Sequence, residues 1–375
     1  MADIVFEQIE EENESYSNDD VFDITSWGAD LSFRELITMY EEDELIKPEL
    51  QRKYVWEKTE ASRFIESILL GLPVPSVFLA KLKDDTMLII DGYQRIMSIY
   101  EYVKVGIFSK DEKVFKLSNS KLINERWRGK AFSELKSEEQ RKIRSTTIHA
   151  IIFQQKKPDD SQNTSLFQVF ERINTGGKTL NAQEVRNCVY QGDFNRLLFE
   201  LNKNPMWRIV YGDNIEDSRM RDIELIVRFF AISNFNPDNI ESSQISLKKY
   251  LNEFMGSDES KNINILKKRK LDFDNVMSFV LKNLGKNAFH NINEKSNFIE
   301  RFHPTIFDAI SCATLRYLET INSSDGEVID IKDKHIQLLQ DIRFQDATSV
   351  RTTNVEKIKL RISLAAEYLY NMKVF

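Results

Sequence analysis

Residues 87–100 read Met-Leu-Ile-Ile-Asp-Gly-Tyr-Gln-Arg-Ile-Met-Ser-Ile-Tyr, and this stretch carries the strongest structural signal in the chain. The apolar run at 87–90 predicts a short buried strand. Ile96, Ile99, Tyr100 and Val103 recur at the spacing of one helical face. The sequence therefore predicts a strand, a tight Asp-Gly turn and a helix in direct succession.

A turn of this kind can bind phosphate. The first N–H groups of a helix have no partner inside the helix and favour anions. Gly92 lets a backbone or a ligand approach closely. Arg95 can pair with phosphate oxygens through two N–H groups, and Asp91 can hold a metal ion or orient a water molecule. The plainer alternative is an ordinary turn followed by a surface arginine.

The segment before this unit supplies further polar candidates. Pro48–Trp56 is expected to be extended and carries Gln51 and Arg52. Thr59–Leu70 is expected to be an amphipathic helix that ends at Gly71. Strands are expected at 77–82 and 86–90, joined as a hairpin, with a further strand region at 107–117 and another strand at 147–153.

A second motif lies at residues 170–180, Phe-Glu-Arg-Ile-Asn-Thr-Gly-Gly-Lys-Thr-Leu. Its Asn174, Thr175, Gly176 and Gly177 can be a loop between two helices, because Asn181 and Glu184 are spaced as the cap of the next helix. Alternatively, the loop N–H groups and Arg172 face the same ligand as Arg95. The spacing leaves both interpretations open.

These motifs, in this order, resemble the N-terminal domain of the GmrSD type IV restriction endonucleases, whose hallmark is Asp-Gly-Gln-Gln-Arg. Here Tyr93 stands where that family usually has Gln, whereas Asp91, Gly92, Gln94 and Arg95 fit the hallmark. The first half also resembles the ParB/sulfiredoxin fold. The resemblance implies an α+β protein in which a small mixed sheet with helices precedes an all-α region.

Three parts of the chain are expected. Residues 1–20 are read as an acidic leader, residues 21–157 as a ParB-like nucleotide-binding domain, and residues 158–375 as a helical domain. The boundary is placed at the turn-rich stretch Lys156–Asp160.

The resemblance implies a bacterial anti-phage component that is expected to bind and hydrolyse a nucleoside triphosphate with Mg²⁺ to control action on foreign, often modified, DNA. Asp91 and Gln94 are the expected catalytic residues, with Asp91 also the metal ligand. The expected nucleotide- and phosphate-binding residues are Gln51, Arg52, Gly92, Arg95, Arg172, Asn174, Thr175, Gly176 and Gly177.

Two other functions remain open. The chain can be a non-enzymatic nucleotide- or DNA-binding switch for a separate nuclease chain, or a ParB-like nuclease. The sequence has no clustered His and Asn of an HNH nuclease, so an HNH-type subunit is an expected partner. The oligomeric state is open and allows a homo-oligomer.

The charge is unevenly distributed along the 375 residues. The net charge is -7, yet residues 1–50 carry sixteen acidic and two basic residues, which leaves the remainder mildly basic. No apolar run approaches the roughly 20 residues of a membrane span, so no membrane partner is expected. Cys188 and Cys312 lie in apolar helical patterns and are expected to be buried thiols in a cytoplasmic protein.

Overall fold

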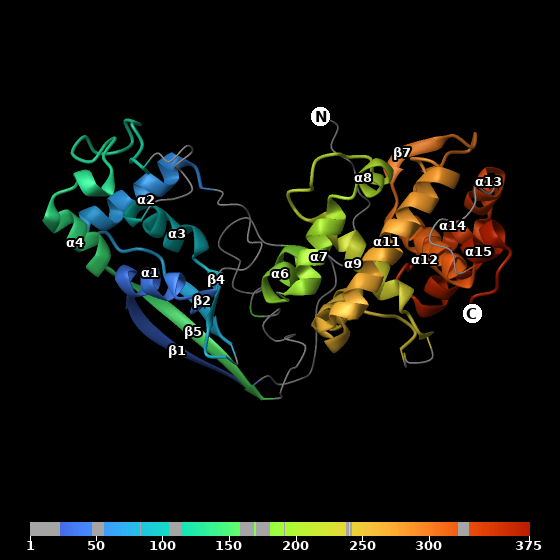
Figure 1. Ribbon diagram of the computed structural model, residues 1–375, viewed down its shortest axis with the longest axis horizontal. Coiled ribbons are helices and arrows are strands. Elements are labelled where there is room, and N and C mark those ends of the chain that lie inside the picture. Colours follow the sequence, from blue (N-terminus) through green and yellow to red (C-terminus); the bar gives the residue numbers. More distant parts are fainter. Residues whose placement is uncertain are drawn as a thin grey trace.

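The structure is a computed structural model, and it describes residues 23–46, 56–82, 84–104, 114–157, 169, 181–190, 192–237, 240, 242–321 and 330–375. Within these residues the chain first forms a mixed sheet with helices and then a region that is mostly helical, so the expected α+β class is confirmed. Figure 1 shows α1–α4 beside the long strands β1 and β5, and the helices from α6 onward in the other half of the molecule. The proposed leader at 1–20 lies outside the described residues.

The first part contains a five-stranded sheet in the order β1-β5-β3-β4-β2. β1 is antiparallel to β5 and β3 to β4, whereas β3 runs parallel to β5 and β2 parallel to β4. The elements are β1 (Asp23–Ser32), α1 (Phe33–Glu41), β2 (Leu45–Ile46), α2 (Lys58–Leu70), β3 (Val77–Lys81), β4 (Met87–Asp91), α3 (Tyr93–Val103), the 3-10 helix η3 (Phe132–Glu134), α4 (Ser137–Ser145) and β5 (Thr147–Lys157).

Each face of the sheet belongs to a different buried cluster, because side chains alternate along a strand. Val77 and Leu79 of β3 pack with α1, α2 and α3. Ala80 of β3 and Leu88 of β4 point to the other face and join the cluster that contains Val185 in the helical region. The sheet is therefore buried on both sides, which explains the continuous apolar run of β4.

Several local expectations are confirmed. The hairpin of β3 and β4 is antiparallel, and α2 ends at Gly71 in the left-handed conformation with φ of 79°. Asn181 and Glu184 form the expected capping box. The strand expected at 107–117 is wrong where it can be compared: residues 114–117 form an isolated bridge, Lys116 to Ala131, and 107–113 lie outside the described residues. The domain boundary near residue 157 and the ParB/sulfiredoxin likeness stay predictions.

The second part is built mainly from helices, with one small hairpin. Its elements are α6 (Ala182–Val189), α7 (Asp193–Asn202), α8 (Pro205–Tyr211), α9 (Arg221–Ser233), α10 (Leu247–Gly256), the 3-10 helix η6 (Asp258–Lys261), α11 (Ile263–Asn283), β6 (His290–Ile292), β7 (Phe298–Phe302), α12 (Pro304–Thr320), α13 (Lys332–Gln340), α14 (Ile342–Ser349) and α15 (Val355–Tyr370). Among the described residues, no helix is long and apolar enough to cross a membrane.

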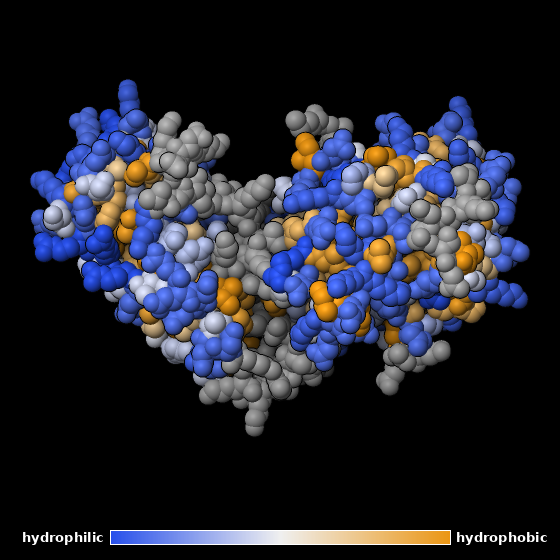
Figure 2. All heavy atoms as spheres, viewed as in Figure 1, coloured by the Kyte–Doolittle hydropathy of each residue, from blue (hydrophilic) through white to orange (hydrophobic). Residues whose placement is uncertain are grey.

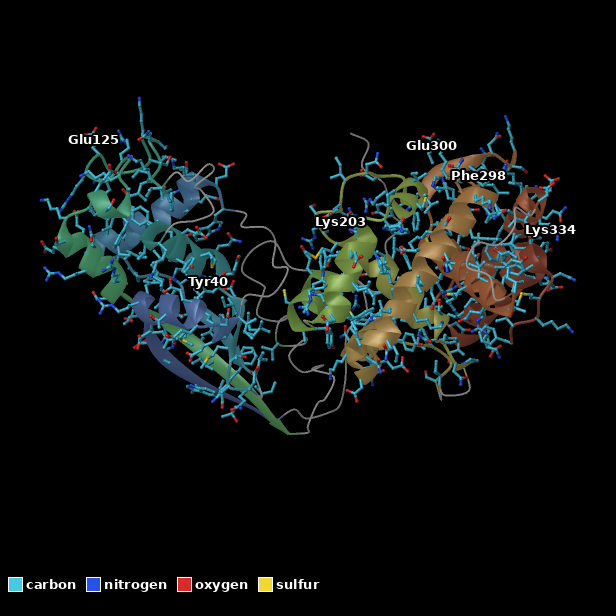
Figure 3. The ribbon with its side chains drawn as sticks, viewed as in Figure 1. Tyr40, Glu125, Lys203, Phe298, Glu300 and Lys334 are labelled. Carbon is cyan, nitrogen blue, oxygen red and sulfur yellow. The ribbon has the colours of Figure 1, made fainter. Side chains whose placement is uncertain are left out.

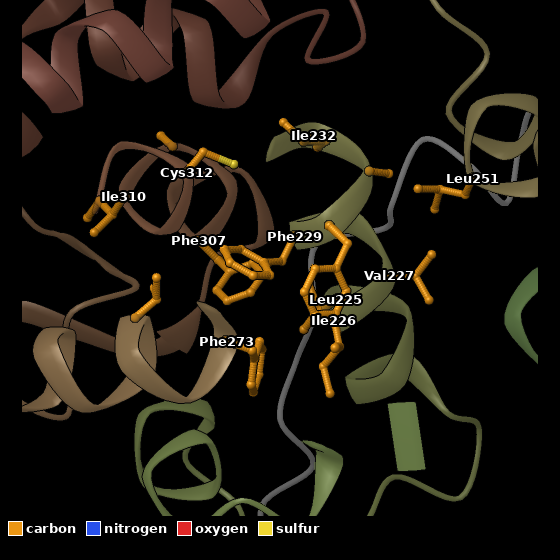
Figure 4. Packing of buried hydrophobic residues seen from close by; sticks show 14 of the residues in the cluster. Leu225, Ile226, Val227, Phe229, Ile232, Leu251, Phe273, Phe307, Ile310 and Cys312 are labelled. Atoms are coloured by element: carbon orange, nitrogen blue, oxygen red, sulfur yellow. The ribbon is translucent and has the colours of Figure 1, made fainter. Parts of the chain in front are cut away.

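α9 lies at the centre of this helical part. Its Phe229 packs against Phe273 of α11, with ring centroids 5.6 Å apart, and against Phe307 of α12 at 6.5 Å (Figure 4). Cys312 also lies in this core, and both Cys188 and Cys312 are free and buried, as expected. Burial raises the pKa of both thiols, which keeps them protonated.

A buried carboxylate joins three helices of this core. Asp308 of α12 accepts hydrogen bonds from Arg228 of α9, at 2.6 Å from Nη2, and from Arg361 of α15, at 3.3 Å. The Asp308 side chain is 0% exposed, and those of Arg228 and Arg361 are 4% and 2% exposed. The two arginines therefore share one carboxylate that is buried from solvent.

His335 of α13 gives the fold a predicted pH dependence. Burial lowers the pKa of His335 to about 4, against a hydrogen bond to the backbone of Ala288 that raises it. The unfolded chain, with a pKa near 6.5, binds more protons between about pH 6.5 and 4. We therefore expect the free energy of unfolding to fall across this window as pH decreases, by up to about 3 kcal/mol.

Urea denaturation at several pH values measures this dependence. His335→Leu should flatten much of the slope between about pH 6.5 and 4 relative to the parent chain. Part of the slope should remain, because burial also lowers the pKa of His290. A slope identical in His335→Leu and the parent would show that the buried imidazole does not cause the acid sensitivity.

Candidate functional site

The first motif forms the connection between β4 and α3, as its sequence predicts. β4 ends at Asp91, and Gly92 is the N-cap of α3 with φ of 101°, a conformation that favours glycine. The Gly92 carbonyl accepts the first intrahelical bond from the Ile96 N–H at 3.0 Å. Arg95 thus lies in the first turn of α3, where it was expected.

A close approach to Gly92 was expected, and a neighbouring strand of the protein itself makes it. A Cβ atom on Gly92 would lie 2.3 Å from Cγ1 and 2.9 Å from Cβ of Val77, a residue of the neighbouring strand β3. Gly92 is therefore required by both its backbone conformation and its packing. The need for glycine at this position has a structural cause that does not involve a ligand.

Asp91 and Arg95 form an ion pair across the turn. The Arg95 side chain is 14% exposed and that of Asp91 is 41% exposed, so the pair lies at the edge of the buried region. The two expected functional groups are thus brought together, and each currently serves as the partner of the other. An anionic ligand that binds Arg95 has to compete with this carboxylate.

Gln94 ties α3 to the segment that precedes α2. Its side-chain oxygen accepts a hydrogen bond from the Trp56 N–H at 3.3 Å, and its carbonyl accepts one from the Ser98 hydroxyl at 2.7 Å. Trp56 ends the stretch expected to carry Gln51 and Arg52, two residues that lie outside the described part of the chain. The Gln94 side chain, for which a catalytic role was expected, thus forms a structural hydrogen bond with Trp56.

Tyr93, the residue that departs from the family hallmark, packs against the cluster formed by α1, α2 and α3. Burial, with smaller contributions from Tyr40 and Glu101, raises the pKa of Tyr93 to about 12. Its phenol therefore stays neutral at physiological pH. Tyr40, labelled in Figure 3, lies on α1 and packs against the same cluster.

The second motif can be located through the helix that follows it. Arg172, Asn174, Thr175, Gly176 and Gly177 all lie outside the described residues, so their expected roles stay predictions.

Asn181, where the described chain resumes, is firmly anchored to the start of α9. Its amide donates to the Arg219 carbonyl at 2.6 Å, and Glu184 pairs with Arg219 at 3.3 Å. The second motif therefore leads directly into the interface of α6 with α9.

α6 carries a buried polar cluster that the sequence reasoning missed. Arg186, 0% exposed, donates to Asn252 of α10 at 2.9 Å and to Gln183 at 3.0 Å, and lies 3.6 Å from Glu224 of α9. Gln183 in turn donates to Asn187 at 2.9 Å. The signal was available: polar residues at 183, 186 and 187 form an i, i+3, i+4 stripe beside apolar neighbours.

This cluster is costly to maintain in the interior. Burial raises the pKa of Glu224, although Arg186 and Arg228 oppose the shift. Glu224 Oε1 and Asn252 Nδ2 are buried and have no hydrogen-bond partner among the described residues. Buried polar groups destabilise a fold unless they are paired, so the cluster is a candidate for a role beyond packing.

Asp91 can contribute one ligand to a metal ion. Within the described ranges, no group of three or more His, Cys, Asp or Glu residues could hold a metal by itself. Mg²⁺ in nucleotide sites is usually bound by one or two carboxylates together with phosphate oxygens. One carboxylate beside a phosphate-binding turn therefore fits Mg²⁺ that arrives with a nucleotide.

Two cavities in the helical part lie away from the first motif. One of about 360 Å³ is lined by Phe235, Asn236, Pro237, Arg316, Lys359 and Phe375. Another of about 250 Å³ lies between α9, η6, α11 and α12. Neither is lined by Asp91, Gln94 or Arg95, so neither cavity is connected with the chemistry of the motif.

Together, the mixed sheet, the glycine-led turn with its Asp–Arg pair and the following helices define an α+β protein with a candidate anion site at the start of α3. Residues 33–191 match the model of the GmrSD restriction endonuclease N-terminal domain, so this part of the chain is similar to that domain. A comparison with curated proteins found no match.

Proposed function

We propose that this chain is a phage-defence component that binds a nucleoside triphosphate at the turn between β4 and α3 and hydrolyses it to control action on foreign DNA. The observation that carries the proposal is the Asp91–Arg95 pair, held at a helix start by Gly92. The match of residues 33–191 to a restriction endonuclease domain supports the defence context. Hydrolysis, the base preference and the DNA target are parts of the proposal.

The ion pair provides a way for Mg²⁺ and nucleotide to bind together. When phosphate oxygens take Arg95, the Asp91 carboxylate is released and can coordinate the ion that accompanies the phosphates. The Asp91–Arg95 ion pair is thereby replaced by two favourable contacts, one between Arg95 and phosphate and one between Asp91 and Mg²⁺. Mg²⁺ would neutralise the charge that develops on the phosphates during transfer. Gln94 would be the second polar group near the reacting phosphate.

Titration with each of the four nucleoside triphosphates, with and without Mg²⁺, tests the proposal. Saturable Mg²⁺-dependent binding with phosphate release supports the enzyme. Binding without release supports the alternative, in which the chain is a switch for a separate nuclease subunit. A plasmid-nicking assay tests the remaining alternative, a ParB-like nuclease. Absence of binding by all four nucleotides would contradict the proposal.

Arg95→Ala should weaken nucleotide binding by at least about tenfold, because a charge-assisted phosphate contact contributes about 1.5–3 kcal/mol. Thermal stability should change by a few degrees at most, since no core volume is removed. Isothermal titration measures the affinity. Arg63→Ala on α2, an exposed arginine of the same domain, is the matched control. Retained affinity in Arg95→Ala would reduce Arg95 to a structural partner of Asp91.

A further inference from the structure

The segment 116–144 has a charge opposite to that of the whole chain. It contains nine lysines and arginines and four glutamates, a net charge of +5, whereas the chain as a whole carries -7. It comprises the loop before η3, η3 itself and α4. We define the α4 patch as three exposed cations, Lys121, Lys136 and Arg141, together with two partly exposed ones, Lys130 and Arg144.

Members of the α4 patch form no ion pair with a carboxylate of the described residues. Among the described residues, Lys116 pairs with Glu134 at 3.3 Å and Arg126 with Glu139 at 2.8 Å, and the structure records no ion pair for members of the α4 patch. The pKa of Glu134 is lowered chiefly by hydrogen bonds from Ala131 and Lys116, and only slightly by the charge of Lys130. The patch therefore presents positive charge to the solvent.

The basic run at 267–270, the densest in the sequence, shows the opposite behaviour. Lys268 lies 2.8 Å from Asp272 and 3.0 Å from Glu319, and Arg269 lies 3.1 Å from Glu259. Arg269 is also enclosed by aromatic rings, with Phe254 at 4.6 Å. Density of positive charge along the sequence is therefore a poor guide to the exposed basic surface, because Asp272 of α11 and acidic residues of other elements pair with this run.

The α4 patch is held on a rigid base. The Trp127 indole N–H donates to Glu139 of α4 at 2.9 Å, and the Asn124 N–H donates to Glu66 of α2 at 2.6 Å. The Arg144 guanidinium lies 5.0 Å from the centre of the Phe132 ring. The loop and the helix therefore move as one unit, which lowers the entropy lost when several cations contact one partner.

The chemistry of the patch favours the backbone of a nucleic acid duplex. Arginine and lysine neutralise phosphates, and contacts of this kind carry no sequence preference. Single strands are usually bound by stacking on exposed aromatic rings. Here the aromatic residues Trp127 and Phe132 are buried, at 4% and 7% exposure, and Leu122 is the large apolar side chain of the segment that is exposed.

We propose that the α4 patch is the surface on which the chain contacts the phosphate backbone of duplex DNA. This inference rests on the proposed function for the kind of partner, and on the geometry above for its location. In Figure 1, α4 lies at one end of the molecule and α13 towards the other. Deeply hydrophilic side chains gather at the α4 end in Figure 2. The contact surface is separate from the Asp91–Arg95 turn.

The test compares two triple variants of the full chain. Lys121→Gln with Lys136→Gln and Arg141→Gln removes three exposed cations of the patch. Lys203→Gln with Lys332→Gln and Lys334→Gln removes the same charge from exposed positions in the helical part, where Figure 3 labels Lys203 and Lys334. Anisotropy of a labelled duplex of arbitrary sequence, at several salt concentrations, measures the affinity.

The patch variant should bind the duplex at least about tenfold more weakly at low salt, and its slope of log affinity against log salt should decrease by about 2 to 3, since each neutralised phosphate contributes about 0.9. The control variant should resemble the parent. Glu125→Gln with Glu138→Gln should strengthen binding, because it removes the two glutamates of the segment for which no ion pair is recorded in the described structure. Nucleotide binding should be unchanged in all variants, which separates this inference from the proposed function.

Three results would overturn the inference. Equal losses in the patch and control variants would mean that overall charge, and not this surface, governs the affinity. If a single-stranded oligonucleotide bound the patch as tightly as the duplex or more tightly, the proposal that duplex DNA is the partner would be wrong. Patch-dependent binding of vesicles that contain anionic lipid, with no duplex binding, would reassign the surface to a membrane.

Discussion

Asp308→Asn should lower the free energy of unfolding by about 3–5 kcal/mol, because it removes the buried carboxylate charge that two buried guanidinium groups share. Arg228 and Arg361 both donate to Asp308, and all three side chains are almost completely buried. Asparagine has nearly the same volume as aspartate, so the substitution changes charge and hydrogen bonding rather than packing. A large effect would therefore be electrostatic in origin.

Urea denaturation followed by circular dichroism measures this change. Asp193→Asn is the matched control, because Asp193 forms an exposed ion pair with Arg196 in which the side chains are 56% and 60% exposed. Exposed pairs contribute at most about 1 kcal/mol, so the control should unfold almost like the parent. A loss below about 1 kcal/mol in Asp308→Asn would show that water or another group compensates the arginines.

Local sequence patterns predicted the elements around the first motif because each carries its own signal. The β3–β4 hairpin, the glycine that ends α2 and the cap at Asn181 all depend on residues a few positions apart. β1 was missed for the opposite reason. Asp23–Ser32 contains Gly28 and several polar residues, and it becomes a strand by pairing with β5, more than a hundred residues later in the chain. Edge strands of this kind depend on their partner more than on their own composition.

In the candidate site, too, contacts between residues close in sequence were predictable and contacts between distant residues were not. Proximity of Asp91 and Arg95 follows from their i, i+4 spacing across the turn, and the sequence placed both correctly. The polar cluster of Arg186, Glu224 and Asn252 joins three helices, so the polar stripe of α6 can be read locally but its partners on α9 and α10 cannot. The basic run on α11 is paired partly by Asp272 of the same helix, but also by Glu259 and Glu319, which other elements supply.

Gly92 illustrates how a motif residue can be explained by the fold alone. The helix start needs a left-handed residue at this point, and the Val77 side chain occupies the space where a Cβ would lie. A glycine in a phosphate-binding motif is commonly attributed to close approach by the ligand. In this chain the neighbouring strand makes that approach, so loss of function on substitution would not by itself identify a ligand site.

Gly92→Ala should therefore destabilise the α+β part by about 3 kcal/mol or more. A non-glycine residue in this backbone conformation costs about 1–3 kcal/mol, and overpacking against Val77 adds about 1–3 kcal/mol. Gly212→Ala is the matched control: its φ of 89° is also left-handed, but nothing lies within 4 Å of the added Cβ. The control should show the backbone cost alone.

The double variant Gly92→Ala with Val77→Ala separates the two contributions, since it removes Cγ1 of Val77, the atom closest to the new Cβ. Its destabilisation should be smaller than the sum of the two single changes, because contacting residues are coupled by about 0.5–3 kcal/mol. Urea denaturation of all four variants provides the comparison. If Gly92→Ala and Gly212→Ala unfold alike, strand β3 does not restrict this position, and the space beside Gly92 is open to a ligand after all.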